Sequence, residues 1–102
     1  MNKDPQIAAI VKEILDLIKN ISPGKSVELR VPPYGAIQCV AGSNHRRGTP
    51  PNTVEMSGQT LVRLINEPSL WSSLYKSGEV RASGLLSDLS KVFAQAAAKY
   101  RG

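Results

Sequence analysis

Residues 54–84, VEMSGQTLVRLINEPSLWSSLYKSGEVRASG, decide the fold class, because two helical patterns lie between two strand patterns in this stretch. Apolar side chains recur at steps of one, three and four over residues 58–66 and 70–76, which predicts two short helices. Short segments at 54–56 and 80–83 predict strands on either side. This order departs from the regular strand–helix alternation of a doubly wound sheet and favours an α+β fold.

Polar residues mark the helix boundaries in the C-terminal half. Ser57 and Ser69 precede the two short helices and are expected to cap them. Ser87 or Asp88 is expected to cap a last helix, whose apolar stripe consists of Leu89, Val92, Phe93, Ala96, Ala97 and Tyr100. The chain therefore ends on an amphipathic helix with one face available to a core.

The N-terminal half adds one long helix and two strands. Residues 5–21 carry a wide apolar stripe, with Asp4 as N-cap and a proline at the first helical position. Residues 26–31 alternate apolar and polar side chains, which predicts a half-buried strand, and residues 36–40 predict another. The intervening Pro-Pro-Tyr-Gly corner either closes a hairpin or interrupts one long strand, and the sequence leaves both open.

The predicted elements form a single domain over residues 1–102. We expect an α+β fold in which helices cover one face of a small, largely antiparallel sheet. Residues 41–53 hold almost no apolar side chains and predict a loop. Long loops in small domains are often functional, so this segment is a candidate for ligand contact.

Composition excludes several classes of protein. The 102 residues include one cysteine and one histidine, so neither an internal disulfide nor a zinc site of the usual Cys/His kind can form. No apolar run approaches the length of a membrane span, and the N-terminal region lacks the apolar core of a signal peptide. The sequence therefore predicts a cytoplasmic protein with no bound cofactor.

The net charge of +5 raises the question of nucleic-acid binding. The 13 Lys and Arg residues are spread along the chain, whereas a nucleic-acid footprint gathers them on one helix or stripe. Nucleic acid is therefore not the expected partner. Catalysis is not expected either, because Cys39 lies in an apolar strand and no serine-hydrolase or phosphate-binding motif is present.

Two groups of residues resemble a known family. Gly78, Val80, Ala82 and Gly84 follow the helix pair in a pattern similar to the later part of the sterol carrier protein superfamily. The segments RVPPY, residues 30–34, with Gln38, and RGTPPN, residues 47–52, resemble the smaller branch of bacterial sterol carrier orthologues. Together these motifs cover most of residues 25–90, and the two Pro-Pro motifs are the more specific part.

The resemblance implies a sheet of about five strands covered by helices, with an apolar cavity between the two layers. Members of the superfamily bind and carry sterols, fatty acids or acyl-CoAs without chemistry. We therefore expect non-catalytic binding of an apolar or amphipathic small ligand, such as a lipid or acyl chain, with an anionic head as one option.

A basic cluster in the polar loop is the first candidate site. His45, Arg46 and Arg47 could bind the carboxylate or phosphate head of a ligand, because the guanidinium group matches such oxygens. Alternatively, these side chains are solvated and contribute only to solubility. In the first case, replacing both arginines with alanine is expected to weaken the binding of an anionic ligand without unfolding the protein.

Four further residues are candidates for ligand contact. Tyr34 and Gln38 could place polar groups at an apolar pocket, although Tyr34 packing at the sheet edge is the simpler interpretation. Trp71 is expected in the core, where it could also close a cavity. Arg30 belongs to the family motif, but an ion pair with Glu55 across two strands is preferred for it.

A second function hypothesis is a protein–protein interaction module. The two Pro-Pro motifs and the basic composition would then contact an acidic partner protein, with no ligand cavity. An apolar void distinguishes the two hypotheses, and its expected lining is Ile37, Val54, Leu61, Leu74, Val80 and Phe93.

Overall fold

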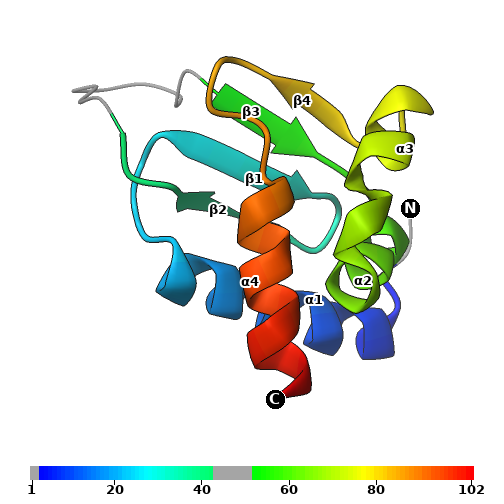
Figure 1. Ribbon diagram of the computed structural model, residues 1–102. Coiled ribbons are helices and arrows are strands. Elements are labelled where there is room, and N and C mark those ends of the chain that lie inside the picture. Colours follow the sequence, from blue (N-terminus) through cyan, green and yellow to red (C-terminus); the bar gives the residue numbers. More distant parts are fainter. Residues whose placement is uncertain (1–2, 43–51) are drawn as a thin grey trace.

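The computed structural model describes residues 3–42 and 52–102, and Figure 1 shows the arrangement of their helices and strands. In chain order the elements are α1 (Pro5–Ile21), β1 (Val27–Val31), β2 (Gly35–Cys39), β3 (Asn52–Glu55), α2 (Gly58–Asn66), the 3-10 turn η1 (Pro68–Leu70), α3 (Trp71–Lys76), β4 (Arg81–Ser83) and α4 (Ser90–Arg101). The α+β prediction is confirmed.

The long N-terminal helix begins where the sequence predicts. The Asp4 carboxylate accepts hydrogen bonds from the backbone N–H groups of Gln6, at 2.9 Å, and Ile7, at 3.3 Å. These bonds satisfy two of the donors that a helix leaves unpaired in its first turn. The buried stripe of α1 consists of Val11, Ile14, Leu15 and Ile18.

The sheet of the described residues has four strands in the order β2-β1-β3-β4, one fewer than the family resemblance implies. Strands β1 and β2 form an antiparallel hairpin, which settles the alternative left open at the Pro-Pro-Tyr-Gly corner. Strands β3 and β4 are also antiparallel, whereas β1 and β3 run parallel. The sheet is therefore mixed, with antiparallel pairing predominant.

Side chains alternate between the two faces of the sheet. On β1, Val27, Leu29 and Val31 are fully buried, while the two residues between them are half-buried. Figure 1 shows the helices gathered on one side of the sheet, and the buried side chains of β1 and β3 belong to the core shared with these helices. The opposite, outer face is polar, which confirms the predicted coverage of one face.

Charges on the outer face pair differently from the prediction. Arg30 lies directly opposite Glu55 in the β1–β3 register, as expected. The ion pairs, however, join Arg30 to Glu28 at 3.0 Å and Arg81 to Glu55 at 2.6 Å. Residues two apart on one strand share a face, so Glu28 competes for the Arg30 guanidinium.

Several boundaries differ from those predicted by periodicity. Strand β3 begins at Asn52, so it includes the last two residues of the predicted polar loop. Ser69 lies inside the η1 turn and does not cap α3, because the chain turns at Pro68 before the helix forms. The last helix begins at Ser90, with Leu89 at the cap position.

The core is closed by the two largest apolar side chains. The Trp71 and Phe93 rings lie 5.9 Å apart at an interplanar angle of 36°, and both belong to the buried cluster.

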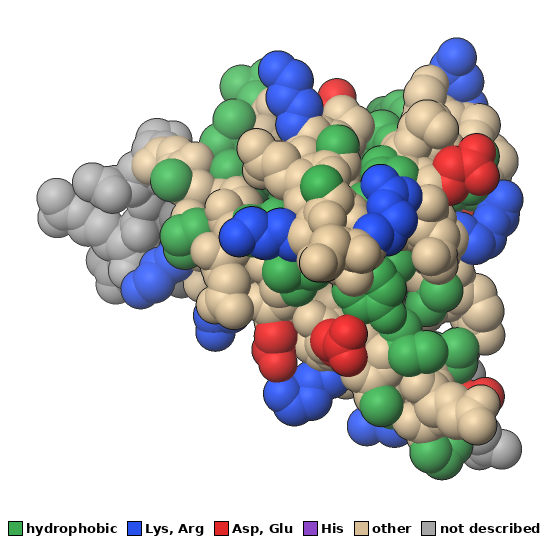
Figure 2. Space-filling view, turned by 60° about the horizontal axis from the view of Figure 1, so that its bottom comes forward, with side chains coloured by type: hydrophobic (Ala, Val, Ile, Leu, Met, Phe, Trp, Pro, Cys, Tyr) green, Lys and Arg blue, Asp and Glu red, His purple; other side chains and the backbone are tan. Residues whose placement is uncertain are grey.

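Within residues 3–42 and 52–102, no helix is long and apolar enough to cross a membrane. Figure 2, with the lower side of Figure 1 turned forward, shows Lys and Arg side chains distributed over this face and not gathered into a stripe.

Candidate functional site

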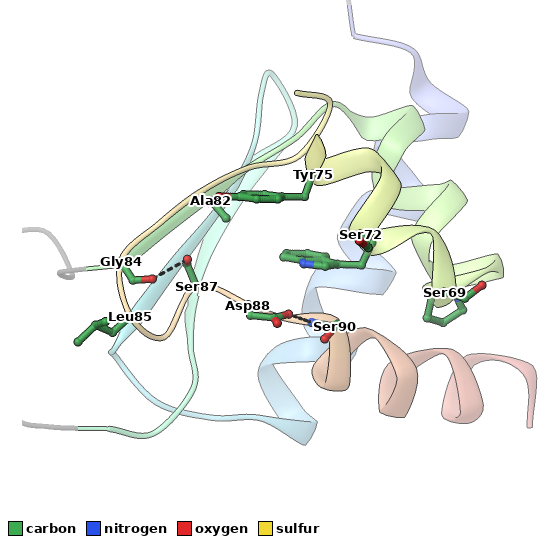
Figure 3. A pocket seen from close by; sticks show the side chains of 11 residues that line it. Ser69, Ser72, Tyr75, Ala82, Gly84, Leu85, Ser87, Asp88 and Ser90 are labelled. Atoms are coloured by element: carbon green, nitrogen blue, oxygen red, sulfur yellow. Dashed lines mark hydrogen bonds between the residues drawn. The ribbon is translucent and has the colours of Figure 1, made fainter. Parts of the chain in front are cut away.

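A pocket with two aromatic side chains in its lining lies where α3, β4 and the start of α4 meet (Figure 3). We call it the β4–α4 pocket. Its volume is about 510 Å³, within the usual range for small-molecule sites. The residues that line it are Pro68, Ser69, Trp71, Ser72, Tyr75, Ala82, Gly84, Leu85, Ser87, Asp88 and Ser90.

Two aromatic side chains from α3 form the apolar wall of this pocket. Trp71 is 7% exposed and rests on Phe93, so its position is fixed by the core. Tyr75, one helical turn later, is 52% exposed. Ala82 of β4 pairs with buried Val54 and so belongs to the inner face of the sheet. A small side chain at position 82 leaves the space between the sheet and α3 open.

The opposite rim of the pocket is polar. The Ser87 hydroxyl donates a hydrogen bond of 2.7 Å to the Gly84 carbonyl, and the Asp88 carboxylate accepts one of 2.9 Å from the Ser90 backbone N–H. Hydrogen bonds from the Ser90 backbone and side chain, assisted by the charge of Lys91, lower the pKa of Asp88. Asp88 is therefore ionised at neutral pH, and within residues 3–42 and 52–102 it is the only acidic or basic residue that lines the pocket, apart from the Tyr75 phenol.

The loop over residues 84–89, which joins β4 to α4 and carries this rim, is held by Asn52. The Asn52 side chain accepts a hydrogen bond of 2.9 Å from the Leu86 backbone N–H and donates one of 2.8 Å to the Ser26 carbonyl. Asn52 is 4% exposed, and it is not among the site residues predicted from the sequence. The signal available in the sequence was an amide side chain directly before an apolar strand.

Of the residues predicted to bind a ligand, Trp71 lines the β4–α4 pocket. Tyr34 lines a separate pocket of about 520 Å³ beside the β1–β2 turn, and its hydroxyl oxygen accepts a hydrogen bond of 3.3 Å from the Asp4 N–H. The Tyr34 hydroxyl is therefore linked to the start of α1.

The structure does not bring Arg30 and Gln38 to the β4–α4 pocket. Both side chains belong to the outer face of the sheet, because each alternates with the buried residues of its strand. The pocket opens on the helix side, next to Ala82. His45, Arg46 and Arg47 lie outside the described residues, so the binding of an anionic ligand head by this basic cluster stays a prediction.

The six residues expected to line an apolar void are mostly core residues. Val54, Leu61, Leu74, Val80 and Phe93 are each at most 3% exposed, and none of the six lines the β4–α4 pocket or the Tyr34 pocket.

Cys39 is fully buried, and desolvation raises the pKa of its thiol to about 11. A protonated, buried thiol is inert as a nucleophile.

Comparison with known proteins decides the family. The model of the family described as "Bacterial SCP ortholog" matches residues 3–94. The chain belongs to this family. The match covers the whole sheet and the first turn of α4, so it includes every residue that lines the β4–α4 pocket of this SCP orthologue.

A solved structure supports the fold. The protein described as "UbiJ-SCP2 Ubiquinone synthesis protein" superposes on this SCP orthologue with a TM-score of 0.56 at 18% sequence identity. The alignment covers 100% of this chain and 98% of the other, so the SCP2-like fold extends over the full length of the SCP orthologue. No curated protein matches the sequence.

Proposed function

We propose that this SCP2-like protein binds an apolar or amphipathic small molecule in the β4–α4 pocket and carries it without chemical change. The observation that carries this proposal is the pocket itself, with the Trp71 ring fixed by the core, the half-exposed Tyr75 ring and a small residue at position 82. SCP2-like domains generally bind lipids, which agrees with an apolar wall of this kind.

The charge of the rim bears on the polar end of the ligand. Asp88 contributes a carboxylate, and no Lys or Arg is among the described residues that line the pocket. An anionic head is disfavoured beside an ionised carboxylate, whereas hydroxyl and carbonyl groups can bond to the serine rim. We therefore propose an uncharged head in this pocket, in place of the anionic head that the basic loop suggested.

The first test asks whether the purified protein carries a ligand. Native mass spectrometry of the protein, with organic extraction of the same sample, is expected to show an added mass that extracts as a lipid. A second arm titrates ligand-free protein with dodecanol, dodecanoic acid and dodecylamine, which share one alkyl chain and differ in head charge. A quinone with an alkyl tail, decylubiquinone, is added because the structural neighbour is described as a ubiquinone synthesis protein.

Binding is read from Trp71, the single tryptophan of the chain. Its fluorescence is expected to change on addition of dodecanol or decylubiquinone, with weaker binding of dodecanoic acid. If no extracted lipid is found and none of the four probes changes the fluorescence or the native mass, the carrier function is wrong and the interaction-module hypothesis gains support.

A matched pair of variants locates the site. Ala82→Leu fills the pocket from the inner face of β4 and is expected to weaken probe binding at least tenfold. Ser83→Leu adds the same side chain to the outer face of the same strand and is expected to leave binding within twofold of wild type. Equal effects of the two substitutions would place the ligand elsewhere.

A further inference from the structure

Exposed apolar side chains gather at the mouth of the β4–α4 pocket. In the described part of the chain, the large apolar residues that are exposed are Tyr75 at 52%, Leu85 at 101% and Leu86 at 40%. Tyr75 and Leu85 both line the pocket, and Leu86 follows Leu85 on the 84–89 loop. Single exposed leucines are common on protein surfaces, but a fully exposed leucine and a half-exposed tyrosine at the rim of one pocket mark a candidate interaction surface, whereas the Leu86 side chain lies beside Gly42.

Leu85 lies at the outermost point of this group. Figure 3 shows its side chain directed away from the protein body, on the far side of the loop from Ser87 and Asp88. The conformation of this loop is fixed by two hydrogen bonds. The Asn52 side chain accepts one from the Leu86 backbone N–H, and the Ser87 hydroxyl donates one to the Gly84 carbonyl. A fixed loop therefore keeps a leucine side chain fully in water.

The charge around these residues distinguishes the two kinds of surface that can cover them, a lipid bilayer and another protein. The chain carries a net charge of +5, and the exposed residues Lys76 and Lys91 directly follow the pocket residues Tyr75 and Ser90. Asp88 on the same loop opposes these two lysines with one negative charge, so the local balance is positive, as is the net charge of the chain. Apolar side chains on a positively charged surface favour a lipid bilayer that contains anionic lipids, since apolar insertion and electrostatic attraction then act together.

We propose that the 84–89 loop, with Leu85 at its tip, docks this protein on the surface of an anionic lipid bilayer. The proposal extends the ligand-binding function proposed above, because docking in this orientation places the mouth of the β4–α4 pocket against the source or destination of its ligand. Insertion of Leu85 removes from water a side chain that is fully exposed in the free protein.

The test uses ligand-free protein and vesicles of phosphatidylcholine with or without phosphatidylglycerol. Flotation is expected to show binding to the anionic vesicles, weaker binding in high salt and little binding to phosphatidylcholine alone. Leu85→Ser is expected to lower the partition coefficient about tenfold, because it removes the inserting side chain without changing the net charge. The control Ala9→Ser, at an exposed position of α1, is expected to bind as the wild type does.

A second readout reports which face touches the vesicle. Cys39 is fully buried, so a cysteine introduced by Leu85→Cys or by Ala9→Cys can be labelled alone with a polarity-sensitive fluorophore. We expect vesicles to shift the emission to the blue at position 85 and to leave position 9 unchanged. The reverse pattern, equal binding of wild-type and Leu85→Ser protein, or no vesicle binding by the wild type would overturn the proposal.

The two proposals fail separately in these experiments. Vesicle binding is measured without ligand, and the alkyl probes are titrated without vesicles. Docking that depends on Leu85 in a protein that binds no probe would leave the docking surface in place and remove the carrier function. Probe binding with no vesicle association would do the opposite.

Discussion

Asn52, the first residue of β3, is bonded to the 84–89 loop, because its side-chain oxygen accepts a hydrogen bond of 2.9 Å from the Leu86 backbone N–H. The same side chain donates to the Ser26 carbonyl at 2.8 Å, directly before β1. One buried amide therefore joins three segments that are distant in sequence. The position of the pocket rim, and of Leu85 beyond it, depends on this residue.

Replacement of Asn52 with alanine is expected to destabilise the fold and to loosen the loop. The substitution leaves the Ser26 carbonyl and the Leu86 N–H without their partner, which costs about 2 kcal/mol of unfolding free energy. Chemical denaturation measures this loss, and hydrogen exchange at the Leu86 amide is expected to accelerate.

The matched control is Asn66→Ala. Asn66 is exposed, and its side-chain hydrogen bond among the described residues goes to the Val62 carbonyl within its own helix, at 2.9 Å. Its replacement is expected to change the unfolding free energy by less than about 0.5 kcal/mol. Similar losses for the two variants would contradict the bridging role of Asn52.

Gly84 and Gly78 make a second matched pair. Both have positive φ angles, +109° at Gly84 and +85° at Gly78. A Cβ atom at position 84 would collide with the Asn52 side-chain oxygen and lie 2.9 Å from Asn52 Cα, whereas a Cβ atom at position 78 meets nothing within 4 Å. Gly84→Ala is therefore expected to cost about 3 kcal/mol, and Gly78→Ala about 1 kcal/mol from backbone strain alone.

Thermal and chemical unfolding of the two glycine variants measures the difference. In addition, Gly84→Ala displaces the Asn52 side chain, so its loop amides are expected to exchange as fast as those of Asn52→Ala. Equal stability of the two glycine variants would show that the loop can retreat from Asn52 at no cost.

The Cys39 thiol is expected to be unreactive in the folded protein. Its pKa of about 11 leaves roughly one thiolate in a thousand molecules at pH 8, and the side chain is fully buried. A thiol reagent such as DTNB is therefore expected to label Cys39 only as fast as the protein unfolds. Labelling of the native protein at the rate measured in denaturant would contradict this burial.

The same thiol makes stability depend on pH in the alkaline range. Between the unfolded pKa of 9.0 and the folded pKa of about 11, the unfolded chain loses a proton that the folded chain retains. The unfolding free energy therefore falls as pH rises through this window, by about 2–3 kcal/mol in total from this group.

Other groups titrate in the same range, so the measurement compares wild type with Cys39→Ala. The difference between their unfolding free energies is expected to be constant below pH 9 and to change in favour of the alanine variant as pH approaches 11. A constant difference over the whole range would mean that the folded thiol titrates normally.

The sequence alone determined the local structure of most of the chain. The caps at Asp4 and Ser57, with their apolar stripes, specify α1 and α2 because a helix is stabilised by residues three and four positions apart. Alternation over residues 27–31 specified β1 and its buried face for the same local reason. The family motifs placed these elements in an SCP-like fold.

Tertiary structure alone decided the sheet order and the candidate site. The parallel contact of β1 with β3 joins segments separated by a hairpin and a polar stretch, and no local pattern encodes which edge β3 takes. The β4–α4 pocket likewise draws its residues from η1, α3, β4, the 84–89 loop and α4. The sequence shows that Trp71 and Ala82 are apolar. Only the tertiary structure places them at one pocket, because a void depends on distances between segments that the local sequence does not specify.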